Sequence, residues 1–303
     1  MHTRKLRYFL AILDHGSIRG AAEKLGMTQP TLSQALSSLE TDFGSRLLNR
    51  SRSGVSLTTV GSIVERRARE ILSDVSRLCE EVSDVQTLDR GEVRLGIASI
   101  VAPSAVTKVI SQSLQERPGV RIVVKRGGSE ALWKSVSRGD LDLAIARMPA
   151  PESEPDITGR KLTDDPYVIW AAKDHPLSRI DNPTVTDLRN YPWVFASDWK
   201  TTFPEMNSLL ESLGDPPLSP AVDCAEMEVA AALMSNGPFL SIWPRSCFLD
   251  TLIAGRFIAL PIPGKTPTCC IGVLWRARRD PSPAAKMTIR NLSSVFVQRV
   301  KDR

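Results

Sequence analysis

Three short amphipathic helices are predicted within the first 43 residues, and they constrain the fold more than any other feature of the sequence. Apolar residues repeat at helical spacing in three runs, which are Leu6, Phe9, Leu10 and Leu13, then Ile18, Ala21, Ala22 and Leu25, then Leu32, Leu36, Leu39 and Phe43. Gly16 and Gly26 separate the runs, and Ser17 is placed to cap the second helix. Because only a tight turn at Gly26 and Met27 fits between the second and third helices, the arrangement predicts a helix-turn-helix.

The third helix is the expected DNA-reading element. Thr28 is a candidate N-cap residue and Pro30 fits the first turn. The outward side of this helix is rich in short hydrogen-bonding side chains, which let a helix lie deep in the DNA major groove. We therefore predict that DNA is contacted by Thr28, Gln29, Pro30, Thr31, Ser33, Gln34 and Ser38. The alternative is a helix face that is merely polar, although solvated helices usually carry Glu and Lys there.

A basic hairpin is predicted directly after these helices. Residues 46–58 favour two short strands around Ser53 and Gly54, with Arg50 and Arg52 just before the turn. A hairpin beside a reading helix is a wing, and its two arginines are expected to bind backbone phosphate or the minor groove. The net charge of +5 agrees with this, because residues 1–60 hold eight basic and four acidic side chains and so carry most of the excess.

A long helix with a heptad pattern is predicted to start at Thr58 or Thr59. Its apolar seam is formed by Val64, Ala68, Ile71, Val75, Leu78, Val82 and Val85. Such a seam needs a partner, and a second copy of the same helix is the simplest one. The resulting dimer would suit a pseudo-palindromic DNA site. The alternative is that this helix lies on its own domain.

Strands and helices alternate through the rest of the chain, from about Gly91 onward. Predicted strands lie at 93–97, 120–125, 141–146, 167–171, 193–195, 221–223, 239–243, 257–260 and 269–275. Predicted helices lie at 104–116, 129–139, 184–188, 204–213, 225–235, 245–254 and 283–300. The alternation predicts largely parallel, helix-flanked strands in two lobes, because one sheet would have to be very wide.

Two sets of motifs carry a resemblance to a known family. AAEKL, TQPTLS, LE and SLT fall in residues 1–58, and GEVRLGIA, GDLDLAIAR, DHPL, GPFLSIWPRS and AGRFIALPI follow beyond the long helix. Together they resemble LysR-type transcriptional regulators along nearly the whole chain. Two departures from the family's pattern are Gln34, which stands where the family often has Arg, and Leu48, which replaces a common Phe at the root of the wing.

The resemblance implies an α/β fold class with an N-terminal domain of helices and a wing. It implies a winged helix-turn-helix at 1–58, a linker dimerisation helix at 59–90 and a periplasmic-binding-protein-like effector-binding domain at 91–303. Lobe I of that domain is expected at about 91–162 and 269–303, and lobe II at about 163–268. The function implied is that of a sequence-specific regulator of transcription, an activator or a repressor, controlled by a small molecule. Its partners would be double-stranded DNA, the effector and further copies of the chain, as a homodimer and homotetramer.

The loops at the carboxyl ends of the predicted strands, between the lobes, are the expected effector site. They offer hydroxyl groups, cations and backbone amides at a helix N-terminus, which favour a small organic anion. The predicted contacts are Ser99, Ile100, Gly128, Ser129, Arg147, Ser197, Lys200, Thr201, Thr202 and Phe203. A neutral sugar-like or aromatic ligand would use the same hydroxyl groups, and Arg147 has the alternative of a surface ion pair.

Other classes of protein find little support in the sequence. No apolar run approaches the length of a membrane helix and the first residues lack a signal-peptide pattern, so a cytoplasmic protein without a membrane partner is expected. The five cysteines and three histidines show no metal-ligand spacing, so neither metal nor cofactor is expected. Cys269 and Cys270 lie in an apolar run that favours a buried strand over a redox pair, and His175 is expected in a solvated turn.

Two alternatives to a regulator can be stated. One is an enzymatic or solute-binding domain with an attached helix-turn-helix, but no nucleophile or phosphate-binding motif supports it, and the chain is not expected to be an enzyme. The other is a structural DNA-coating protein, which would not need a two-lobed crevice.

Overall fold

The computed structural model describes residues 3–51, 54–87, 91–150, 152–195, 211, 219–224, 226–248, 255–261 and 267–301. The chain divides into two compact units. The first comprises Met1–Arg90 together with the short segment Arg138–Asp140, and the second comprises Gly91–Ser137 and Leu141–Arg303.

The first unit begins with three helices, α1 (Thr3–Asp14), α2 (Ile18–Lys24) and α3 (Gln29–Phe43). Both predicted caps are present: Ser17 accepts a hydrogen bond from the backbone of Gly20, and Thr28 accepts one from the backbone of Thr31. The predicted apolar faces form the core of the unit. Leu25 and Phe43 are the exceptions, since they lie at the ends of their helices and are 38% and 39% exposed.

The predicted wing is present as an antiparallel pair, β1 (Leu48–Ser51) and β2 (Gly54–Leu57). Its root is fixed by α3, because the Glu40 carboxylate accepts a hydrogen bond of 2.8 Å from the backbone of Leu47. The backbone of Val55 donates to the carbonyl of Gly16, in the turn between α1 and α2. The wing is therefore hydrogen-bonded to the helices just before β1 and within β2.

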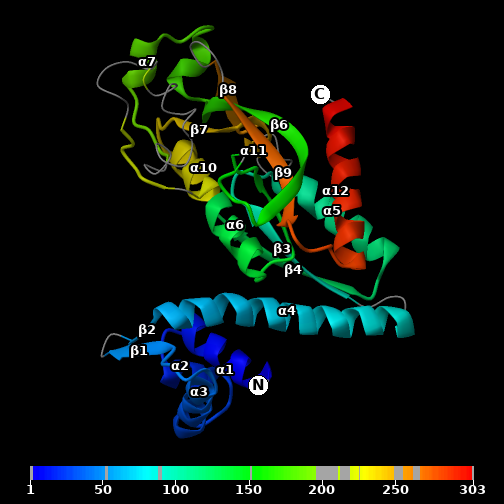
Figure 1. Ribbon diagram of the computed structural model, residues 1–303. Helices are drawn as coiled ribbons and strands as arrows, with labels where there is room; N and C mark the ends of the chain where they lie inside the picture. The colour runs from blue at the N-terminus through cyan, green and yellow to red at the C-terminus, as the bar shows by residue number, and fades with distance from the viewer. Residues whose placement is uncertain are drawn as a thin grey trace. The chain divides into compact units, whose positions relative to one another are not determined.

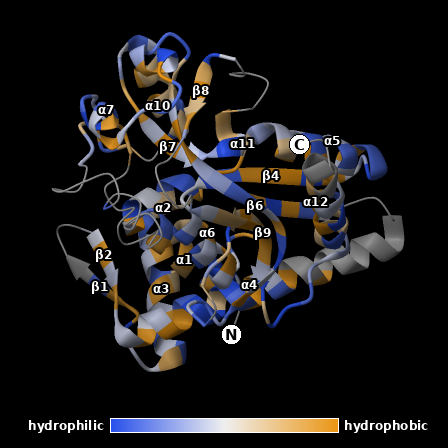
Figure 2. Ribbon diagram, turned by 90° about the horizontal axis from the view of Figure 1, so that it is seen from above, coloured by the Kyte–Doolittle hydropathy of each residue, from blue (hydrophilic) through white to orange (hydrophobic). Residues whose placement is uncertain are grey.

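Helix α4 (Thr59–Thr87) uses its apolar residues in two ways. Val64 and Ala68 are buried in the core of the first unit, so their predicted place in a seam between two chains is wrong. Val60, Ile63, Ile71 and Leu78 are exposed instead. Figure 2 shows hydrophobic and hydrophilic residues interspersed along the described part of α4. The apolar residues of α4 thus form one face that packs on the core of the first unit and a second face that is exposed.

The second unit is built on a sheet whose strands follow the order β4-β3-β5-β9-β6-β7, with β8 also paired to β6. The strands are β3 (Gly91–Ala98), β4 (Val120–Gly127), β5 (Leu143–Arg147), β6 (Ile157–Ala172), β7 (Ser241–Pro244), β8 (Phe257–Leu260) and β9 (Thr268–Arg276). Strands β3, β4 and β5 are parallel, and the pairs that involve β6 or β9 are antiparallel. We call the part around β3, β4, β5 and β9 lobe I and the part around β7 and β8 lobe II.

Strand β6 is much longer than the predicted strand at 167–171. Residues 157–166 pair with β9, and residues 167–172 pair with β7 and β8. One strand therefore runs through both lobes. This explains how six strands form one hydrogen-bonded path, with β8 as a branch on β6, where the sequence predicted separate sheets.

Helices cover the sheet. They are α5 (Pro103–Glu116), α6 (Ser129–Arg138), α7 (Val185–Arg189), α10 (Met227–Asn236), α11 (Arg245–Phe248) and α12 (Pro283–Lys301), with a 3₁₀ helix η1 (Pro176–Arg179). Helices α5 and α12 lie side by side (Figure 1), where Asn291 donates a buried hydrogen bond to Ser113. The predicted helix at 204–213 lies outside the described residues except for Glu211, which is helical.

His175 is buried, so the predicted solvated turn is wrong. Its Nδ1 accepts a hydrogen bond of 3.1 Å from the backbone of Leu177 and so caps η1, and its ring packs on Tyr191. Cys269 is buried in β9 as predicted, and burial raises the pKa of its thiol to about 12. A thiol with this pKa stays protonated, which argues against a reactive cysteine.

Candidate functional site

The outward face of α3 has the polar character predicted for a DNA-reading surface. Gln29, Pro30, Thr31 and Gln34 are exposed, and Ser33 and Ser38 are half-buried. Thr28 is exposed too, but its hydroxyl lies 2.8 Å from that of Thr31 and also caps the helix. Its side chain therefore serves the local structure as well as any contact with DNA.

A groove lies between the start of α1 and the outward face of α3. It has a volume of about 660 Å³ and is lined by Thr3, Arg4, Lys5, Tyr8, Thr31, Gln34, Ala35 and Ser38. Three of the predicted DNA-binding residues, Thr31, Gln34 and Ser38, thus share one concave surface with the residues of α1. Arg4 is exposed at this surface, whereas Lys5 forms an ion pair of 2.8 Å with Asp42.

The spacing of the sequence does not predict that Arg4 and Tyr8 belong to this site, because nothing in α1 shows that its first turn lies against α3. The basic charge of residues 1–60 was the one signal that could have drawn attention to Arg4.

The structure describes one of the two wing arginines, and only its backbone. Arg50 lies in β1, paired with Val55 of β2, and the structure describes its backbone alone. Arg52 lies outside the described residues. Their predicted contacts with phosphate remain predictions.

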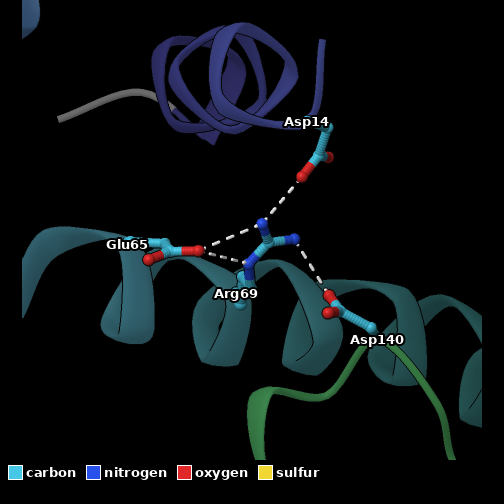
Figure 3. Close-up of polar contacts among 4 residues, drawn as sticks. All are labelled: Asp14, Glu65, Arg69 and Asp140. Carbon is cyan, nitrogen blue, oxygen red and sulfur yellow. Dashed lines mark hydrogen bonds and ion pairs between the residues drawn. The ribbon is translucent and has the colours of Figure 1, made fainter. Parts of the chain in front are cut away.

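Arg69 of α4 forms ion pairs with three carboxylates of the first unit (Figure 3). Its guanidinium donates to Asp14 at the end of α1 at 2.8 Å, to Glu65 one turn back at 3.2 Å and to Asp140 at 2.9 Å. Burial alone would lower the pKa of Arg69, but the hydrogen bond and charge of Asp14, the charge of Asp140 and the hydrogen bond to Glu65 together raise it. The side chain is therefore a permanent cation among three carboxylates.

In the second unit, five of the predicted effector-binding residues lie at one edge of the sheet. Ser99 and Ile100 follow β3, Gly128 and Ser129 follow β4, and Arg147 ends β5. The three strands are parallel and in register, so their carboxyl ends meet. Ser99 and Ser129 are buried, and the Ser129 hydroxyl accepts a hydrogen bond of 3.3 Å from the backbone of Arg147. The Arg147 guanidinium lies 4.8 Å from the ring centre of Trp133.

Two further groups reach this edge, and nothing in the sequence spacing predicts them. Arg126, near the end of β4, forms an ion pair of 3.1 Å with Glu228 of α10 and approaches the carbonyl of Ser99 at 3.5 Å. The Cys247 thiol donates to the carbonyl of Ile100 at 3.1 Å, and burial raises its pKa well above the usual value. Both groups connect lobe I with lobe II.

The remaining predicted effector contacts, Ser197, Lys200, Thr201, Thr202 and Phe203, lie outside the described residues. A separate hollow of about 380 Å³ lies beside α10 and is lined by Met227, Glu228, Ala231, Ala232, Ser235, Asn236, Arg256 and Phe257. It shares no residue with the predicted effector set.

Comparison with protein families decides the class of protein. Residues 3–62 match the model of a bacterial regulatory helix-turn-helix protein of the lysR family, and residues 86–296 match the LysR substrate binding domain. The chain belongs to the LysR family of transcriptional regulators. Proteins of this family are DNA-binding regulators with an effector-binding domain and are not enzymes. The predicted family, fold class and non-enzymatic character are confirmed.

Relatives of this LysR-type regulator span nearly its full length. The SDS degradation transcriptional activation protein of Pseudomonas sp. (strain ATCC 19151) is 30% identical, with 93% of this chain and 92% of that protein covered. The HTH-type transcriptional regulator GbpR of Azospirillum brasilense is 26% identical over 95% of this chain and 85% of its own length.

Solved structures agree on the fold. Full-length CbnR in complex with its target DNA has a TM-score of 0.66 at 20% identity, covering 97% of this chain and all of that one. A full-length OxyR variant from Pseudomonas aeruginosa has a TM-score of 0.68 at 22% identity, with 98% of this chain and 97% of that one covered.

Two further properties of the regulator can be stated for the part of the chain that the structure describes. None of the helices there is both long and apolar enough to pass through a membrane. The same residues contain no group of three or more His, Cys, Asp or Glu side chains arranged to hold a metal ion.

Proposed function

We propose that this LysR-type regulator reads a specific operator with α3 and with the groove between α3 and the first turn of α1. The observation that carries the proposal is the joint lining of that groove by Thr31, Gln34 and Ser38 with Arg4 and Tyr8. Gln34 can bond to an adenine edge, and Arg4 supplies a cation for the adjacent phosphate. Thr28, Gln29, Pro30 and Ser33 would support the contact, and Arg50 and Arg52 of the wing would bind the backbone.

A gel shift on the intergenic DNA upstream of the gene tests this proposal. Wild-type protein should stay bound in excess unrelated DNA, whereas Gln34→Ala should lose this selectivity and Arg50→Ala should bind operator and unrelated DNA more weakly alike. Gln115→Ala is the matched control, because Gln115 is an exposed glutamine of α5 in the second unit. Equal binding by all four proteins, abolished by competitor, would show that α3 does not read sequence.

We also propose that the regulator works in the cytoplasm, where the chromosome lies, as a homodimer that assembles into homotetramers. Val60, Ile71 and Leu78 are exposed on α4 and share one helical face, because their spacings of eleven and seven residues are close to whole turns. A second copy of α4 is the simplest cover for this stripe. The corresponding domains are 1–58, 59–90 and 91–303, with lobe I at about 91–162 and 269–303 and lobe II at about 163–268.

The effector is proposed to be a small organic anion bound between the lobes. The support is the meeting of Ser99, Ser129 and Arg147 at the carboxyl ends of three parallel strands, beside the N-terminus of α6. Ile100 and Gly128 would line the same site, with Ser197, Lys200, Thr201, Thr202 and Phe203 completing it. Calorimetric titration with a panel of carboxylates and their amides tests this: binding by the neutral compounds alone would refute an anionic effector.

A further inference from the structure

The ion pair between Arg126 and Glu228 joins the two lobes beside the proposed effector site. Arg126 lies one residue before the end of β4, and its register partner on β3 is Ile97, two residues before Ser99. One Nη of Arg126 lies 3.1 Å from the Glu228 carboxylate, and the other lies 3.5 Å from the Ser99 carbonyl. The guanidinium is therefore at the edge where β3, β4 and β5 end.

This ion pair is easily exchanged. The side chains of Arg126 and Glu228 are 38% and 56% exposed, and pairs with this exposure contribute little to stability. Glu228 also lies in the first turn of α10, where a carboxylate is favoured without any side-chain partner. Breaking the ion pair therefore costs little free energy, both for Arg126 and for Glu228.

We propose that Arg126 receives the anionic group of the effector, and that Glu228 takes the place of that group in the free protein. This inference rests on the proposed anionic effector. A free carboxylate can bind a guanidinium through two parallel hydrogen bonds, whereas the structure shows Glu228 bonded through one oxygen. The ligand would gain further bonds from the Ser99 and Ser129 loops, whereas the hydrogen bond described for the Glu228 side chain is the one from Arg126.

The exchange also gives the effector a means of changing the structure. Arg126 belongs to lobe I, whereas α10 packs on β6 and lines a hollow together with Phe257 of β8, in lobe II. When the ligand replaces Glu228, one of the bonds between the lobes is lost, so the ligand favours states in which α10 is free of β4. Coupling of this kind is reciprocal, so a variant without the Glu228 charge should bind the ligand more tightly.

Calorimetric titration of the full chain tests the inference, with succinate and benzoate as probes and their amides as neutral counterparts. Glu228→Gln should bind at least one carboxylate about tenfold more tightly than wild type, since an internal competitor is removed. Arg126→Gln should show no measurable carboxylate binding. The matched controls are Glu226→Gln, an exposed carboxylate without a side-chain capping bond at the start of α10, and Arg121→Gln on β4, and both should behave as wild type.

The outcomes separate this inference from the proposal on which it rests. Carboxylate binding that is unchanged in Arg126→Gln, or that is no tighter in Glu228→Gln, would overturn the role of Arg126 and leave the anionic effector standing. Binding of the amides alone would refute the anionic effector itself. Absence of carboxylate binding by every protein, Glu228→Gln included, also overturns the inference, provided that thermal unfolding shows each variant to be folded.

Discussion

Arg4 and Gln34 line the same groove but should contribute to DNA binding in different ways. Arg4→Gln removes a positive charge that is proposed to lie next to a DNA phosphate, so the affinity should fall evenly across DNA sequences. The slope of log affinity against log salt concentration should become smaller by about one. Gln34→Ala should instead change the preference among base sequences. Fluorescence anisotropy at several salt concentrations, on operator and scrambled DNA, measures both. Arg121→Gln, in the second unit, should leave the slope unchanged, and an unchanged slope for Arg4→Gln would place Arg4 away from DNA.

His175 should make the stability of the second unit depend on pH. Burial lowers the pKa of its imidazole below the usual 6.5, although the Pro238 backbone and Asp174 partly oppose this. The unfolded chain therefore binds a proton before the folded chain does, and the free energy of unfolding should decrease as the pH falls below about 6.5. His175→Asn keeps an N-cap acceptor but does not titrate, so its stability should fall less over this range.

Urea unfolding of wild type and His175→Asn at intervals between pH 8 and pH 5 provides the measurement. His2 and His15 are common to both proteins, so their contributions cancel in the difference. Parallel pH profiles for the two proteins would contradict the buried, neutral state of His175.

Among the elements, α4 is joined to α1 by the ion pair of Arg69 with Asp14, in addition to the apolar core that the two helices share. Arg69→Gln leaves Asp14, Glu65 and Asp140 around an uncharged group, and we expect the first unit to lose about 1–2 kcal/mol of stability, less than for a fully buried pair because Asp14 is half exposed. Arg67→Gln is the matched control on the same helix, since Arg67 pairs with Glu70 and both side chains are more exposed than that of Arg69. Chemical denaturation should show a much larger effect for Arg69. Equal effects of the two substitutions would mean that the charge of Arg69 among the three carboxylates does not stabilise the first unit.

The sequence predicted the elements whose local chemistry agrees with their tertiary role. Helix α3 is the clearest case, because Thr28, Pro30 and Gly44 mark its ends and three leucines mark its buried face. The first half of β6 escaped prediction for the opposite reason. Residues 157–166 are mostly polar and end in Pro166, which normally argues against a strand. Pro166 is tolerated because it lies where the strand changes partners from β9 to β7.

The candidate sites likewise contain residues that local sequence predicts and residues that only the tertiary structure brings together. The polar face of α3 could be read from helical spacing, and the edge residues Ser99 and Ser129 from the rule for parallel strands. The contributions of Arg4, Arg126 and Glu228 could not, because each depends on contact between segments that are far apart in the sequence. Spacing within one helix likewise could not show which apolar residues of α4 would be covered by the first unit.

For the whole molecule, the exposed stripe of α4 predicts how the chain assembles. Leu78→Asp places a charge in the proposed contact between two copies of α4, so the dimer should dissociate at least in part. Ile180→Asp is the control, because Ile180 is an exposed apolar residue of the second unit and not part of α4. Sedimentation velocity over a range of concentrations measures the result. A Leu78→Asp protein that sediments as wild type does would show that this stripe does not join two chains.

Strand β6 also limits how the second unit can respond to a ligand. Its backbone is continuous through lobe I and lobe II and is hydrogen-bonded to β9 in one half and to β7 and β8 in the other. Movement of one lobe against the other therefore requires torsion of paired strands rather than rotation about a slack linker. Twisting strands that stay paired breaks no ladder hydrogen bond, so the lobes should return when the ligand leaves without any segment of β6 having to refold.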